Sequence, residues 1–118
     1  MTLDELMHLQ QEFDSKHKSK FPWNCEITDD NLEMLEFLLV SLLGELGEVS
    51  NIVKKVVRGD FLLEDKKAEI AEEMADMFIY MMKLSYQMGI DLESACLEKI
   101  KKNQERFEHY EKNTDEEK

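Results

Sequence analysis

A helical spacing of apolar side chains runs unbroken from residue 31 to residue 58. The apolar positions follow one another at steps of three and four residues, the period of an α-helix and not of a strand. Gly59 follows this segment, and glycine commonly ends a helix. One proline and four glycines leave few breaks elsewhere in the 118 residues. The pattern predicts one helix of about 28 residues in an all-α chain.

Three other segments show the same period, at residues 3–18, about 64–88 and 92–107. The first begins with a capping box formed by Thr2 and Glu5, and Asp91 is expected to cap the last. Residues 19–30 interrupt the pattern with Phe21-Pro22-Trp23-Asn24 and are expected to form a connecting loop. We therefore expect four main helices.

The length suits one domain, which we place at residues 1–110, followed by a frayed acidic tail at 111–118. The second and third predicted helices are apolar over more than one stripe. A bundle of four helices facing water needs only one such stripe on each helix. We therefore expect the chain to oligomerise through these wide apolar faces, as a homodimer or a homotetramer.

Charge and cysteine content exclude several classes of protein. Acidic residues number 27 against 15 basic ones, a net charge of -12 that is unsuited to binding a nucleic acid polymer. The amino terminus lacks the bases of a signal peptide, and the longest apolar run has six residues, so no membrane association is expected. Cys25 and Cys96 lie far apart and outside any CxxC spacing. A reducing, cytoplasmic location fits best.

Two acidic pairs interrupt segments that otherwise resemble a protein core, Glu45/Glu48 and Glu73/Asp76. Residues three apart lie on one helix face, and no lysine or arginine is interleaved with these four. Burying an isolated carboxylate costs several kcal/mol, and four together repel one another. A divalent cation bound by oxygen ligands relieves both penalties, which favours Mg²⁺, or Mn²⁺, over Zn²⁺.

These acidic pairs, with 24 residues between them, resemble the ExxE and ExxD motifs of the MazG-like all-α nucleoside triphosphate pyrophosphohydrolases. The segment Pro22-Trp23-Asn24 with Thr28 is similar to the one before the first acidic helix of that family. The segment GIDLESACLEKIKKNQERF is similar to the family's last helix. The resemblance covers residues 21–107.

The resemblance implies a MazG-like fold and hydrolysis of a nucleoside triphosphate, ribo or deoxy, between its α and β phosphates. Magnesium held by Glu45, Glu48, Glu73 and Asp76 would neutralise phosphate charge and activate the attacking water. One carboxylate would accept the proton of that water, and we favour Glu48, although the spacing does not separate a ligand from a general base. The implied biological role is removal of surplus or damaged nucleotides.

The chain departs from the family pattern at three positions. Gly44 stands where many MazG sequences have another glutamate, and Ile27 replaces a glutamine. Gly44-Glu45 instead resembles the dCTP pyrophosphatase branch, but Lys55 stands where that branch has an aromatic residue that stacks on the base. Selectivity for cytosine is therefore not implied.

Several residues are candidates for substrate contact, each beside a plainer structural role. Tyr80 follows Asp76 by one helical turn and either contacts substrate, as in the dCTP pyrophosphatase branch, or packs in the core. Trp23 either stacks on a base or covers the helices. The remaining candidates are basic or amide side chains that would meet phosphates or simply face solvent: Lys55, Lys83, Lys99, Asn103 and Arg106.

Two other functions fit the same residues. Phosphoribosyl-ATP pyrophosphohydrolase uses a related helical fold with similar acidic motifs, although the Pro22-Trp23-Asn24 segment and the long helix argue against it. A non-catalytic acidic interaction module would instead pair its buried carboxylates with lysines. Magnesium separates these classes, because only a metal enzyme should be stabilised specifically by the ion.

Overall fold

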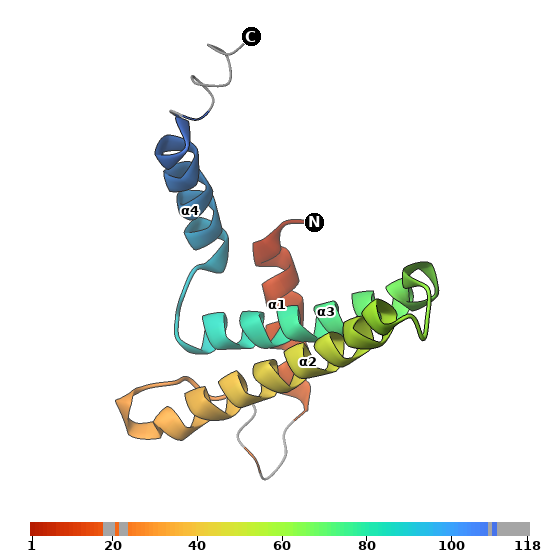
Figure 1. Cartoon of the computed structure of the whole chain (residues 1–118). Helices are drawn as coiled ribbons and strands as arrows, with labels where there is room; N and C mark the ends of the chain where they lie inside the picture. The colour runs from red at the N-terminus through yellow and green to blue at the C-terminus, as the bar shows by residue number, and fades with distance from the viewer. Residues whose placement is uncertain (18–20, 22–23, 109, 111–118) are drawn as a thin grey trace.

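The computed structural model describes residues 1–17, 21, 24–108 and 110. Its regular elements are α1 (Leu3–Lys16), the short 3-10 helix η1 (Asp29–Asn31), α2 (Leu32–Arg58), α3 (Leu63–Gln87) and α4 (Leu92–Arg106), shown in Figure 1. No strand occurs among the described residues, so the all-α prediction with four main helices is confirmed. Trp23 and the predicted acidic tail lie outside the described residues. None of the described helices is long and apolar enough to cross a membrane.

The predicted helix ends are observed in the backbone. The Thr2 hydroxyl accepts a hydrogen bond from the Glu5 N–H at 3.1 Å, and Asp91 accepts one from the Ser94 N–H at 3.0 Å. Gly59 ends α2 in the left-handed region, at φ +92°. The first helix ends at Lys16, two residues before the predicted 18, where a ring nitrogen of His17 lies 2.7 Å from the Phe13 carbonyl oxygen. That contact satisfies a terminal carbonyl and lets the chain leave the helix.

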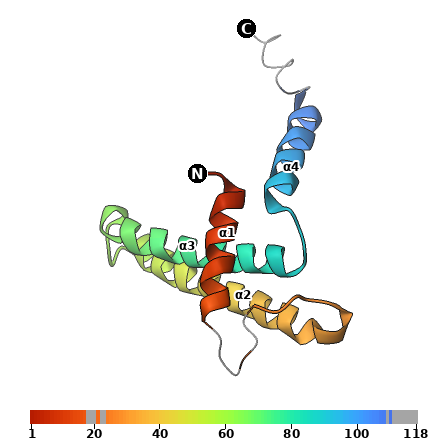
Figure 2. The same ribbon diagram turned by 180° about the vertical axis from the view of Figure 1, so that it is seen from behind.

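The helices α2 and α3 form a long antiparallel hairpin, and α1 crosses one face of it against α3 (Figures 1 and 2). After α3 the chain turns away, and α4 stands apart from the hairpin, packed against α1. The radius of gyration is 18.8 Å. A compact domain of this length would have about 13.5 Å. Within one chain, therefore, the four helices do not close around a single core.

The buried carboxylate of Asp14 on α1 binds side chains of α3. Asp14, 4% exposed, accepts a hydrogen bond from Gln10 Nε2 at 2.9 Å and another from the Tyr86 hydroxyl. The Lys83 ammonium lies 3.5 Å from the same carboxylate. Burial, and then the hydrogen bond to Asp14, raises the pKa of Tyr86 above its usual value, so the phenol keeps its proton and donates. The junction of α1 and α3 thus depends on Asp14.

Replacing Asp14 with alanine should lower the free energy of unfolding by about 3 kcal/mol or more, because it leaves the Lys83 ammonium and the Tyr86 hydroxyl without their acceptor. Urea unfolding at one fixed protein concentration measures this. The matched control is Glu12→Ala on the same helix, which removes an exposed ion pair with Lys16 and should cost under about 0.5 kcal/mol. Equal losses in both variants would contradict this role for Asp14.

Candidate functional site

Two acidic pairs meet where the middle of α2 packs against α3. Glu45 and Glu48 lie one turn apart on α2, and Glu73 and Asp76 lie one turn apart on α3. Because the two helices are antiparallel neighbours, the pairs approach each other. Carboxylate oxygen atoms of Glu45, Glu73 and Asp76 all lie within 4.8 Å of one another. We call these three side chains the carboxylate cluster.

Glu48 lies beside the carboxylate cluster without being one of its three members. It is exposed, but close enough for the Glu73 carboxyl to hydrogen bond to it. All four acids singled out from the sequence are therefore neighbours in space. Glu48 and Asp76 are both exposed, whereas the Glu45 and Glu73 side chains are half-buried.

Two oxygen atoms of the cluster lack hydrogen-bond donors. Oε2 of Glu45 and Oε2 of Glu73 are both buried, and no described residue donates to either. None of the four acids forms an ion pair with a described lysine, arginine or histidine. A buried carboxylate oxygen without a donor needs a proton or a cation. Oxygen atoms alone, converging from two helices, fit a hard divalent cation such as Mg²⁺ or Mn²⁺.

Hydrogen bonding to the neighbouring carboxylates changes the protonation of Glu73. The hydrogen bond that its protonated form makes to Glu45, then the one to Glu48, then desolvation, raise the pKa of Glu73 from 4.5 to about 7. A proton on Glu73 thus relieves the repulsion near neutral pH in the absence of a cation. A bound cation would compete with this proton, so metal affinity should rise with pH.

The predicted substrate residue Tyr80 lies along α3 between the cluster and the junction with α1. It is half-buried, and Lys83 Nζ lies 5.5 Å from the centre of its ring. The Lys83 ammonium is bound to Asp14 and is not a free charge. Asp76, Tyr80 and Lys83 follow at steps of four and three residues, so they line one side of α3. Tyr80 and Lys83 thereby extend the site from the cluster toward α1.

A hollow of 220 Å³ at this junction is lined by Phe13, Asp14, His17 and Lys83. The Phe13 and His17 rings stack with their centres 4.1 Å apart. Phe13 and His17 are not among the predicted site residues, because their place beside Lys83 depends on how α1 crosses α3. In the sequence, the basic residues around His17 indicate only that a helix ends there, because positive charge is favourable at a helix carboxyl terminus.

The other predicted substrate residues are not brought to the cluster by the described part of the chain. Lys99, Asn103 and Arg106 belong to α4, which stands away from the hairpin (Figure 1). Lys55 is half-buried in the last turn of α2, two turns beyond Glu48 on the same side. Phe21, next to the undescribed Pro22 and Trp23, has its ring centre 4.6 Å from that of Phe37 on α2.

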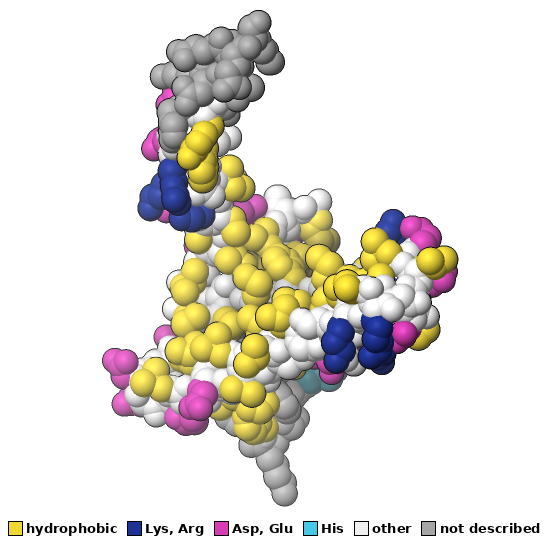
Figure 3. Space-filling model, viewed as in Figure 1, with side chains coloured by type: hydrophobic (Ala, Val, Ile, Leu, Met, Phe, Trp, Pro, Cys, Tyr) yellow, Lys and Arg dark blue, Asp and Glu magenta, His cyan; other side chains and the backbone are white. Residues whose placement is uncertain are grey.

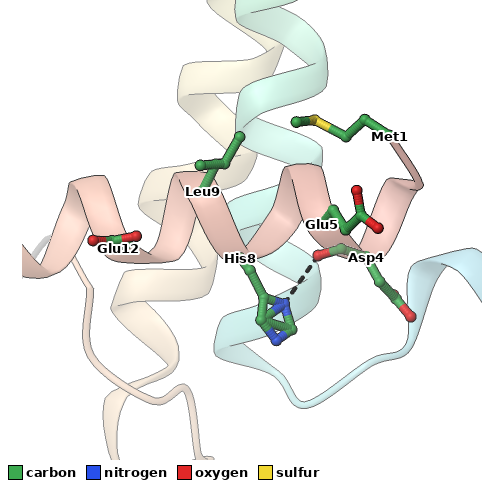
Figure 4. Close-up of a pocket in the computed structure, with 6 residues that line it drawn as sticks. All are labelled: Met1, Asp4, Glu5, His8, Leu9 and Glu12. Carbon is green, nitrogen blue, oxygen red and sulfur yellow. Dashed lines mark hydrogen bonds between the residues drawn. The ribbon is translucent and has the colours of Figure 1, made fainter.

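A separate hollow of 360 Å³ lies along the outer side of α1 (Figure 4). Its lining side chains come from α1 and the residue that begins the chain: Met1, Asp4, Glu5, His8, Leu9 and Glu12. The one hydrogen bond drawn there joins the His8 ring to the Asp4 carbonyl oxygen, at 2.9 Å. No second helix contributes a side chain, and we assign this hollow no role.

Sequence comparison relates the chain to known proteins. The sequence model of the MazG-like family matches residues 29–118, which include both acidic pairs and α4. The chain is similar to the Gene 37 protein of Mycobacterium phage L5, with 28% identity over 79 residues, covering 65% of this chain and 69% of that protein. No solved structure matches the chain significantly.

The metal-free protein should lose stability as the pH rises from about 4.5 to about 7. The unfolded chain releases the Glu73 proton near pH 4.5, whereas the folded chain keeps it until about pH 7, so the stabilising effect of this proton disappears across that window. Melting temperatures in a chelator measure the effect. Glu73→Gln should be less sensitive to pH than the wild type over this range. Parallel pH profiles would show that Glu73 titrates normally.

Proposed function

The chain belongs to the MazG-like family, and from this membership we propose that it is a nucleotide pyrophosphohydrolase that depends on Mg²⁺, or Mn²⁺. The observation that carries the proposal is the carboxylate cluster, in which two buried oxygen atoms have no donor among the described residues. The substrate would be a ribo- or deoxyribonucleoside triphosphate. The products would be the monophosphate and pyrophosphate, and the biological role would be clearance of surplus or damaged nucleotides.

Glu45, Glu73 and Asp76 would hold the cation between α2 and α3. When bound there, Mg²⁺ would neutralise phosphate charge and lower the pKa of a coordinated water. Glu48 is suited to a different task, because it lies beside the cluster, within hydrogen-bonding reach of Glu73, without being one of its three members. In the proposed reaction, a water oxygen attacks the α phosphorus, Glu48 takes the water's proton, and the bond to the β-phosphate oxygen breaks.

The side of α3 that carries Tyr80 and Lys83 would receive the rest of the substrate. Asp14 holds Lys83 in place and offsets much of its charge, so this lysine would orient a phosphate or ribose oxygen more than attract it from a distance. The hollow beside the stacked Phe13 and His17 rings offers an aromatic surface beyond Lys83. Roles for Trp23, Lys55, Lys99, Asn103 and Arg106 remain predictions.

The competing functions fit this geometry less well. An interaction module would pair its buried carboxylates with lysines, yet none of the four acids has such a partner among the described residues. Phosphoribosyl-ATP hydrolysis would use the same cluster and cleave the same kind of phosphoanhydride. Substrate comparison therefore separates this second alternative from the proposal.

Purified protein with Mg²⁺ should release pyrophosphate and a monophosphate from one or more members of a panel of canonical and modified nucleoside triphosphates, with phosphoribosyl-ATP included. Glu45→Gln should lower kcat/KM about 100-fold or more by removing a metal ligand. Glu36→Gln, the same change at an exposed position of α2, should leave kcat/KM unchanged. If phosphoribosyl-ATP alone is hydrolysed, the proposed substrate class is wrong. If no member of the panel is hydrolysed, the proposed enzymatic activity is wrong.

Magnesium binding should distinguish the proposed proton acceptor from the ligands. Glu48→Gln should lower kcat by about 100- to 10,000-fold and keep the rise in melting temperature that Mg²⁺ produces in the wild type. Glu73→Gln should lose both turnover and that rise. Differential scanning fluorimetry with and without Mg²⁺ gives the binding readout. Loss of magnesium stabilisation in Glu48→Gln would make Glu48 a ligand.

A further inference from the structure

The amino-terminal ends of α1 and α4 lie side by side, and this contact positions α4. Figures 1 and 2 show the first turns of the two helices next to each other, while the rest of α4 extends away from α1. In the space-filling view α4 projects from the rest of the chain, with lysine and arginine side chains on its surface (Figure 3). Residues 88–91 connect α4 to α3, and Gly89 has a φ of +71°, in the left-handed region that glycine adopts readily.

The α1–α4 contact brings acidic side chains together. Asp4 and Glu5 lie in the first turn of α1, Glu93 lies in the first turn of α4, and Asp91 caps α4. An acidic residue in the first turn stabilises its own helix through the helix dipole. Because two such turns meet here, the acids of one helix also lie near the acids of the other. Figure 4 shows the Asp4 side chain pointing away from α1, toward the start of α4.

Glu93 of α4 bonds to two groups of α1. Its carboxylate accepts a hydrogen bond from the Leu3 N–H, a donor that has no acceptor within α1, and its side chain forms a hydrogen bond with that of Asp4. Ionised carboxylates only accept hydrogen bonds, so the bond between Asp4 and Glu93 exists only while one of them holds a proton. This bond, then desolvation, then the charges of Asp4 and Asp91, raise the pKa of Glu93 above its usual value.

No described basic side chain offsets the negative charge at this contact. Asp91 accepts hydrogen bonds from the N–H and the hydroxyl of Ser94, both at 3.0 Å, and these lower its pKa, so it stays ionised beside Glu93. The His8 ring bonds to the Asp4 carbonyl oxygen and not to its carboxylate. None of the three acids Asp4, Asp91 and Glu93 forms an ion pair with a described lysine, arginine or histidine. Loss of the shared proton therefore leaves repulsion between α1 and α4.

We propose that Asp4 and Glu93 form a proton-dependent latch, which holds α4 against α1 while one proton is shared and releases α4 when both carboxylates are ionised. Rising pH opens the latch, because it removes the hydrogen bond and adds a negative charge beside Asp4 and Asp91. The released helix would turn about residues 88–91, a short connection of the kind that absorbs the backbone change of a hinge. Lys99, Asn103 and Arg106 lie on α4, so the closed latch keeps these side chains away from the carboxylate cluster.

The distance between spin labels on α1 and α4 tests the latch. One label is attached to the native Cys96, which is exposed on α4, and the other to Leu9→Cys, at a position 51% exposed on α1, with Cys25→Ser to remove the remaining thiol. In a chelator, the distance distribution from pulsed electron resonance should be at least about twice as broad at about pH 8 as at about pH 5. Equal widths at the two pH values would overturn the proposal.

Asp4→Asn should keep the latch closed at both pH values, because the amide donates a hydrogen bond to the ionised Glu93 without needing a proton. The matched control is Glu12→Gln, which also removes one negative charge from an exposed position of α1 and should broaden with pH as the unsubstituted labelled protein does. An Asp4→Asn protein whose distribution broadens equally would show that the bond to Glu93 does not hold α4.

Amide hydrogen exchange tests the same contact without labels, in case the labelled protein does not fold. At about pH 7 the Leu3 amide should exchange at least about 10-fold more slowly in Asp4→Asn than in the wild type, because the closed latch keeps Leu3 bonded to Glu93. The Leu6 N–H, which donates to the Thr2 carbonyl oxygen within the same turn, should exchange at the same rate in both proteins. Equal exchange of the Leu3 amide in the two proteins would overturn the proposal.

Discussion

The packing of α2 against α3 is the constraint on which the other features of this protein depend. It joins two helices whose facing sides are apolar except where Glu45 meets Glu73 and Asp76. Apolar contacts along the rest of the hairpin hold these carboxylates together, and the hydrogen bonds of Glu73 to Glu45 and Glu48 raise its pKa to about 7. On the proposed function, a bound cation would take the place of the Glu73 proton and relieve the repulsion among these carboxylates.

One side of the hairpin carries α1. Asp14 fastens α1 to one side through Lys83 and Tyr86, and this places a hollow next to the side chains that lead from the cluster. Leu43 on α2 and Met74 on α3 are exposed apolar side chains of the same hairpin.

The helices and the acidic pairs could be predicted from the sequence because their signals are local. The helical period, the capping residues and the spacing of Glu45 and Glu48 all depend on residues close in the sequence. Two acidic side chains inside an apolar helix have to be accounted for however that helix packs. The place of Phe13 and His17 beside Lys83 depends on the crossing of α1 over α3, which no local pattern contains. The departure of α4 from the hairpin, which separates Lys99 from the cluster within one chain, is likewise a property of the whole fold.

The charges around the site bear on how an acidic chain would bind an anionic substrate. Lys83, the base nearest to Tyr80 on α3, is already paired with Asp14 and contributes little free positive charge. On the proposed function, neutralisation of the phosphates therefore falls to the cation held by the cluster. The same ion would relieve the repulsion between Glu45 and Glu73 and attract the triphosphate. Metal and substrate would then bind with positive coupling, each raising the affinity for the other by the same factor.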